Sequence, residues 1–153
     1  MNAPFPIADD DSVDLGDLTG SVGFMLRMAQ VTIYEQFFAT FGAQGIRPGE
    51  FTVLWLINLN PGLRQGALAR TLHIKPAHMT KLVQRLVAAG LVRRIVPQED
   101  RRSVLLALTE AGQAHVARHE AEFLRVHDAE RVGLTDTETR NLLALLTKLA
   151  FKG

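Results

Sequence analysis

Hydrophobic residues recur at helical spacing through most of this chain. Over residues 18–41 they stand three or four positions apart, which predicts a helix of about six turns. Gly42 is expected to end that helix, and Pro48 suits the first turn of the next one. Asn60-Pro61-Gly62 stops the second helix, and a short third helix is expected over 66–72.

The segment from Pro76 to Ala89 has the clearest division into an apolar and a polar face. Helical spacing places four apolar residues on one face: Met79, Leu82, Val83 and Leu86. The centre of the opposite face holds Ala77, Lys81, Gln84 and Ala88. Gly90 ends this helix, and residues 91–96 and 103–108 then form two strands around a tip at 97–102. A helix-turn-helix followed by a two-stranded hairpin is a winged helix-turn-helix.

Helices are again predicted after the hairpin. Thr109 is a suitable N-cap for a long helix that extends to about Val126. Gly133-Leu134 breaks the pattern, and Thr135 with Glu138 forms a capping box before a final helix. The expected fold is therefore mainly α, with a small β-hairpin wing and long helices on both sides of the winged helix-turn-helix. The last helix is rich in leucine: Leu142, Leu143, Leu145, Leu146 and Leu149.

Length and composition exclude several classes of protein. The 153 residues suit one domain with an added oligomerisation element. No apolar run approaches about 18 residues and the N-terminus lacks the features of a secretion signal, so a cytoplasmic protein without a membrane partner is expected. Cysteine is absent, which excludes disulfides, thiolate zinc sites, cysteine nucleophiles and thiol-based redox sensing.

Charge is distributed unevenly along the chain. Residues 1–20 hold five aspartates and no base, and we interpret 1–17 as a mobile acidic arm. Residues 64–102 hold nine lysines and arginines against two acids. Such a local excess of positive charge is typical of a protein that binds a polyanion, although a solvated surface with scattered arginines is the simpler alternative.

Two stretches resemble the DNA-binding core of the MarR family of transcriptional regulators. They are LARTLHIKPAHMTKLVQRLVAAGLVRR and, after it, EDRRSVLLALTEAG. The wing pattern D-x-R followed by an apolar strand and L-T-x-x-G is met by Asp100, Arg102, Leu108, Thr109 and Gly112. The similarity extends over about residues 20–150, because the long flanking helices also match the family layout.

The resemblance implies a homodimer, a palindromic double-stranded DNA operator and, often, release by a small ligand. It also implies a division of the chain. Residues 18–46 and 110–153 are expected to hold the dimer together, and 47–109 to bind DNA. LRMAQVTIYEQF and INLNPGLRQGALA are similar to members that respond to aromatic acids or their coenzyme A thioesters. The peroxide sensors of the family that depend on cysteine are excluded.

The recognition helix and the wing supply the candidate DNA contacts. Lysine and arginine can contact guanine or phosphate, glutamine can pair with adenine, and alanine permits close approach. The candidates on this helix are Ala77, His78, Thr80, Lys81, Gln84 and Arg85. By resemblance, Arg102 enters the minor groove, Asp100 pairs with its guanidinium, and Arg101 contacts phosphate. Arg64, Gln65 and Lys75 flank the support helix, where phosphate contact and plain solvation are both open.

The ligand site is less well defined by the sequence. An aromatic wall with one cation suits an anionic or aromatic effector. The candidates are Arg27, Gln30, Tyr34, Phe38 and Trp55, with a plain hydrophobic core as the alternative for the aromatics. His115 and His119 are spaced to share a helix face, with His127 further along, and this spacing permits a metal site. No glutamate follows His115 in an HExxH arrangement and cysteine is absent, so solvated histidines are the simpler interpretation and no metal or cofactor is expected. No catalytic motif is present. An interaction module or anti-repressor that does not bind DNA is the alternative function.

Overall fold

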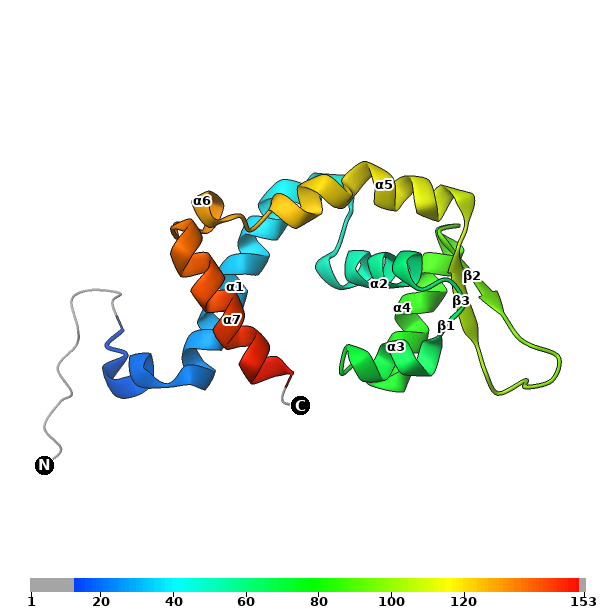
Figure 1. Ribbon diagram of the computed structural model, residues 1–153, viewed down its shortest axis with the longest axis horizontal. Helices are drawn as coiled ribbons and strands as arrows, with labels where there is room; N and C mark the ends of the chain where they lie inside the picture. The colour runs from blue at the N-terminus through cyan, green and yellow to red at the C-terminus, as the bar shows by residue number, and fades with distance from the viewer. Residues whose placement is uncertain (1–12, 152–153) are drawn as a thin grey trace, which may run out of the picture.

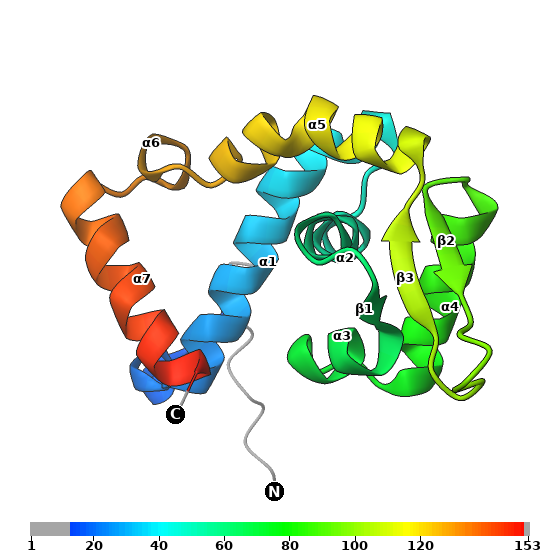
Figure 2. The ribbon, with the colours of Figure 1, turned by 45° about the vertical axis from the view of Figure 1, so that its right-hand side comes forward.

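The computed structural model describes residues 13–151, which form two lobes connected by the long helix α5 (Figure 1, Figure 2). One lobe contains α2, α3, α4 and a small sheet, and the other contains α1, α6 and α7. The helices are η1 (Gly16–Gly20, 3-10), α1 (Val22–Phe41), η2 (Gly42–Gln44, 3-10), α2 (Pro48–Leu59), α3 (Gln65–Thr71), α4 (Pro76–Ala88), α5 (Glu110–Arg125), α6 (Ala129–Val132) and α7 (Asp136–Ala150). The strands are β1 (Leu63–Arg64), β2 (Val92–Ile95) and β3 (Leu105–Leu108). None of these helices has the length and hydropathy needed to cross a bilayer.

The predicted winged helix-turn-helix is confirmed. Pro76 occupies the first turn of α4, and the four apolar residues predicted to face inward are all buried. The connection before α4 is tight enough to place His73 at φ 52°, in the left-handed region that few residues other than glycine adopt. Gly90 adopts φ 74° and ends the helix before β2.

The wing contains one strand more than the sequence predicted. β3 pairs antiparallel with β2, as expected, and also with the two-residue strand β1, giving the order β1-β3-β2. The register pairs Leu63 with Leu106, so the segment between α2 and α3 is attached to the base of the wing. An additional bond from the Gln65 N–H to the Val104 carbonyl (2.9 Å) continues this attachment.

The first helix begins later than predicted. Leu18 belongs to η1, and α1 starts after Ser21, whose hydroxyl accepts a bond from the Phe24 N–H (3.4 Å). Of the apolar residues that recur over 18–41, Phe37 and Phe41 are buried in the single chain. The acidic arm predicted over 1–17 lies mainly outside the described residues.

Local capping signals are confirmed at the two helices that follow the wing. The Thr109 hydroxyl accepts a bond from the Gly112 N–H (3.0 Å) at the start of α5. Thr135 and Glu138 form the predicted capping box of α7. The short helix α6 was not predicted, and it ends at Gly133 with φ 74°.

α5 leads from the wing back to α1, and a hydrophobic cluster rich in aromatic side chains packs where the two helices meet. This aromatic cluster consists of Phe37, Phe41, Ile46, Phe51 and Val126, with Trp55 and Phe123 packed against them.

Candidate nucleic-acid interface

The outward face of α4 carries the side chains predicted to meet DNA. Helical geometry fixes this face, because the opposite side of α4 is anchored in the core by Met79 and Val83, both fully buried. The residues exposed on α4 include Ala77, His78, Lys81, Gln84 and Arg85. The structure therefore presents two cations and an amide to solvent from one rigid helix.

Contacts between α3 and α4 involve two other predicted residues. The Gln65 amide nitrogen donates to the Thr80 hydroxyl (3.2 Å), and that hydroxyl donates to the Pro76 carbonyl (3.0 Å). Both side chains are partly buried, and Gln65 Oε1 has no hydrogen-bond partner. Their evident role in the chain alone is to fix the angle between the two helices. Lys75 precedes α4 and is exposed, as is Arg64 at the start of α3.

The wing tip is ordered by Asp100, but not in the predicted way. The Asp100 carboxylate accepts a bond from the Arg102 backbone N–H (3.2 Å) and another from the Ser103 hydroxyl. Its ion-pair partner is Arg64, with Nη1 3.7 Å from Oδ2, and Arg64 also donates to the Ser103 hydroxyl (2.7 Å). The prediction that Asp100 pairs with the Arg102 guanidinium is wrong for the chain alone. The carboxylate organises the backbone around Arg102, which leaves that exposed guanidinium available to a ligand.

Electrostatics agree with this arrangement of the tip. The Ser103 hydroxyl bond lowers the pKa of Asp100 most, with further lowering by the Arg102 N–H and by Arg64. Ser103 was not among the predicted site residues. The spacing D-x-x-S, in which a serine hydroxyl can close a turn begun by aspartate, is the signal that could have revealed it.

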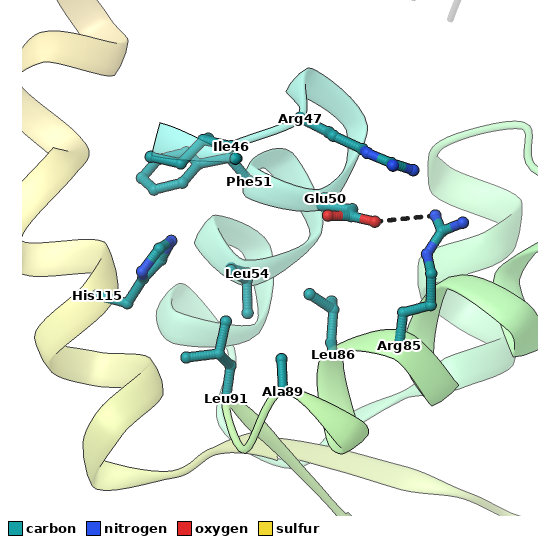
Figure 3. Close-up of a pocket in the computed structure, with 11 residues that line it drawn as sticks. Ile46, Arg47, Glu50, Phe51, Leu54, Arg85, Leu86, Ala89, Leu91 and His115 are labelled. Carbon is teal, nitrogen blue, oxygen red and sulfur yellow. Dashed lines mark ion pairs between the residues drawn. The ribbon is translucent and has the colours of Figure 1, made fainter. Parts of the chain in front are cut away.

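Arg85 lies further from the centre of the α4 face than the other candidates. Its guanidinium pairs with the Glu50 carboxylate of α2 at 2.9 Å (Figure 3). The side chain of Arg85 is 52% exposed, whereas that of Glu50 is 20% exposed. Glu50 was not among the predicted site residues, because nothing in the local sequence connects positions 50 and 85. The pair fastens α4 to the N-terminal turn of α2.

The five candidate ligand residues lie in three different environments: a groove, the aromatic cluster and the exposed surface of α1. Gln30 lines an apolar groove between α1 and α7, and Trp55 packs against Phe51 and Phe123 in the aromatic cluster. Phe38 and Tyr34 are 50% and 45% exposed, and Arg27 is exposed as well. Within residues 13–151 no aromatic contact connects Trp55 to Tyr34 or Phe38. A common site for these five residues therefore stays a prediction.

The two histidines of α5 are packed against the aromatic cluster. Their ring centroids lie 4.8 Å apart, and each also contacts Phe51. In the part of the chain that the structure describes, no group of three or more potential metal ligands is found. Burial lowers the pKa of His115 below its ordinary value of 6.5, and the neighbouring His119 and Arg118 lower it further. Burial, followed by Arg118, also lowers the pKa of His119.

These lowered pKa values predict that stability falls as the solution becomes more acidic. The unfolded chain binds more protons than the folded chain just below pH 6.5, so the stabilisation is complete above that pH and is lost as the pH falls. Denaturant unfolding at about pH 7.5 and about pH 5.5 measures the difference. The double variant H115Q/H119Q should show a smaller difference, whereas H78Q, on the exposed face of α4, should behave as the unaltered chain. An unchanged pH dependence in H115Q/H119Q would refute the assignment.

The chain is similar to known transcriptional regulators in sequence and in structure. The family model described as MarR family matches residues 46–104. A putative transcriptional regulatory protein for the hcr operon of Thauera aromatica is 34% identical over 145 residues, covering 93% of this chain and 87% of that protein. An HTH-type transcriptional repressor of Mycobacterium bovis is 31% identical, with coverage of 91% and 95%. The structure of the transcriptional repressor CouR bound to a 23-mer DNA duplex is 30% identical, with a TM-score of 0.81 and coverage of 92% and 99%.

Proposed function

Because this chain belongs to the MarR family and is a transcriptional regulator of that type rather than an enzyme, we propose that it is a repressor that binds a palindromic operator as a homodimer. One observation carries the proposal: the same lobe exposes the polar face of α4 and holds a wing tip whose backbone is already ordered by Asp100. Two of the similar proteins are named as repressors, and one of these is named as bound to DNA.

In this proposal α4 enters the major groove and the wing reaches the adjacent minor groove. Lys81 and Gln84 read base edges, while His78, Thr80, Arg85, Lys75 and Arg101 contact phosphates or bases around them. Arg102 enters the minor groove, where narrow A·T-rich segments concentrate negative potential. Arg64 and Asp100 hold the tip in shape, and Gln65 supports α4 from α3. Because these groups are already held in place before DNA binds, the entropic cost of ordering them on binding is smaller.

The dimer is proposed to form through the lobe that contains α1 and α7. These helices diverge in a V (Figure 2), and the groove between them is lined mainly by apolar residues. Leu142, Leu143, Leu145 and Leu149 of α7 are between 44% and 66% exposed in the single chain. A second copy would cover this surface, and residues 18–46 and 110–153 would form the dimer while 47–109 bind DNA.

The proposed homodimer is released by a small anionic or aromatic effector. Exposed aromatic side chains on the same helix as an exposed cation support this part, namely Tyr34 and Phe38 with Arg27 on α1. The effector would bind preferentially to a dimer in which the two α4 helices are wrongly spaced for one DNA turn, about 34 Å.

Selection of bound sequences from a random DNA library tests the proposal. Enrichment of a palindrome with half-sites one turn apart is expected. Recovery of unselected DNA only, or of none, would favour an interaction module that does not bind DNA. Retention on heparin that falls steeply with salt would accompany the expected result, because several lysines and arginines contact phosphates.

Replacing Arg102 with alanine should weaken binding to the selected operator by about tenfold or more, corresponding to ~1–3 kcal/mol for a groove-reading arginine. Thermal unfolding should be unchanged, since Arg102 is exposed. R125A, which removes an exposed arginine of α5, is the control for charge alone. Equal affinities of R102A and R125A in a titration at fixed salt would refute the wing assignment.

A further inference from the structure

The turn between α3 and α4 gathers three basic side chains around one open depression. Arg70 stands in the last turn of α3, His73 in the connection and Lys75 directly before α4, and all three are exposed. The depression has a volume of about 410 Å³. The rest of its lining is small or apolar: Gly66, Ala69, Ile74 and Pro76. Of the described residues that line it, none is acidic.

The basic side chains of this turn are not neutralised by the chain itself. Within residues 13–151 none of the three takes part in an ion pair. The Arg70 guanidinium lies against the wall of the depression, because a Cβ added to Gly66 would stand 3.5 Å from Arg70 Nη1. Three nitrogen donors without an acidic partner therefore surround one concave surface, and this arrangement suits an anion.

His73 holds a backbone position that glycine usually occupies. The His73 N–H donates to the Arg70 carbonyl (3.1 Å) and the Ile74 N–H to the Ala69 carbonyl (2.9 Å), which is the Schellman pattern at the end of a helix. The pattern places His73 at φ 52°, where the Cβ of any residue other than glycine is crowded. Glycine would form the same turn without strain, so the turn itself does not need an imidazole. Strained residues of this kind concentrate at functional sites.

The turn lies at the end of its lobe that is proposed to face DNA. In both Figure 1 and Figure 2, α3, the N-terminal end of α4 and the tip of the wing lie at the same end of the lobe, away from α5. When the N-terminal part of a recognition helix enters the major groove, the turn before it comes to the rim of the groove, where the sugar-phosphate backbone runs.

We propose that Arg70, His73 and Lys75 together bind one phosphate group of the operator backbone, at the rim of the major groove and outside the bases that α4 reads. The guanidinium and the ammonium supply positive charge, and a ring N–H of His73 donates to a phosphate oxygen. Such a contact fixes the register of α4 on the duplex without reading sequence. It rests on the proposed function, and it adds Arg70 and His73 to the side chains that meet DNA.

The variant H73G separates the side chain from the turn. Glycine keeps the Schellman pattern and relieves the strain, so the melting temperature should rise by ~2–4 °C. Operator affinity in an anisotropy titration should nevertheless fall by about tenfold, because a hydrogen bond to a charged group is lost. Damage to the fold cannot explain a variant that is more stable and binds DNA more weakly.

The variant R70Q tests the charge at the same position. It should weaken operator binding by about tenfold, and the slope of log affinity against log salt concentration should become shallower by about 1 for each half-site bound. R125Q, which removes an exposed arginine of α5, is the matched control and should keep the affinity and the salt slope of the unaltered chain.

Operators in which one phosphate at a time is replaced by an uncharged methylphosphonate locate the contact. For the unaltered chain, neutralising the phosphate bound by the turn should weaken binding by about tenfold. In H73G and R70Q the same replacement should cost about threefold or less, because the partner of that phosphate is already altered. R102A is the control for this coupling, since its side chain is proposed for the minor groove and the full loss should remain.

The possible failures are distinguishable. An unaltered chain that binds no duplex would refute the proposed regulator and overturn the phosphate contact with it. Operator binding by the unaltered chain, together with undiminished affinity in both H73G and R70Q, would overturn the contact alone. Losses in the variants that depend on no single phosphate would mean that the turn only attracts anions in general, and they would overturn the contact as well.

Discussion

Replacing Leu142 and Leu149 with glutamate is expected to convert the protein into a monomer and to lower its operator affinity by about 100-fold or more. The two leucines stand two turns apart on the same face of α7, and each is 44% exposed in the single chain. Covering such side chains contributes about 25 cal/mol per Å² of apolar area. Glutamate in their place would bury unpaired charges near a two-fold axis, which costs several kcal/mol.

Loss of the dimer should affect DNA binding more than any single contact does. A dimer holds two recognition helices at a fixed distance, so the second half-site is bound without a further loss of translational entropy. A monomer retains one half-site and about half of the phosphate contacts, and its salt dependence should become correspondingly shallower. Sedimentation velocity at micromolar concentration and an operator titration at two salt concentrations measure both effects.

The control variant is L59E. Leu59 is 61% exposed at the end of α2, outside the α1 and α7 surfaces. It should remain dimeric and bind the operator normally, which separates the effect of the interface from that of a lost apolar residue. A wild-type protein that sediments as a monomer, or an L142E/L149E variant that remains a dimer, would contradict the proposed assembly.

Elements whose signals are local were predictable from the sequence. The buried face of α4 follows from residue spacing alone, and the caps at Thr109 and Thr135 depend on residues three positions away. Strand β1 has only two residues, and it is a strand only because β3 lies beside it. No pattern within Leu63–Arg64 could therefore have indicated it.

In the candidate DNA interface too, features set by local sequence were predictable, whereas contacts between residues distant in sequence were not. Exposure of Lys81 and Gln84 was predictable from helical geometry. The partners of Asp100 and Arg85 were not, because Arg64 and Glu50 are each more than 30 residues away and reach them only through the packing of the lobe. Charged residues at a tip can be found in a sequence, but their pairing depends on the fold.

Replacing Gly112 with alanine is expected to destabilise the protein by about 3 kcal/mol or more, although glycine to alanine in a helix normally stabilises by up to about 1 kcal/mol. Gly112 lies in the first turn of α5 and is buried. A Cβ at this position would stand 2.0 Å from the Leu91 carbonyl oxygen and 3.3 Å from Leu108 Cβ. The first of these neighbours is backbone, so it cannot move aside by changing a rotamer.

The same carbonyl explains why the clash cannot be relieved cheaply. The Leu91 oxygen accepts a bond from the Thr109 N–H (3.0 Å), and the Thr109 hydroxyl caps α5 at the Gly112 N–H. Moving α5 away would break the bond to Leu91 and shift the helix that connects the two lobes. Thermal unfolding should show a melting temperature lower by ~6–12 °C for a chain of this size.

G42A is the control for this prediction. Gly42 has φ −57° and there is open space where the alanine Cβ would lie, so alanine at this position should be neutral or slightly stabilising. Equal melting temperatures for G112A and G42A would mean that α5 does not press against Leu91 as the structure shows.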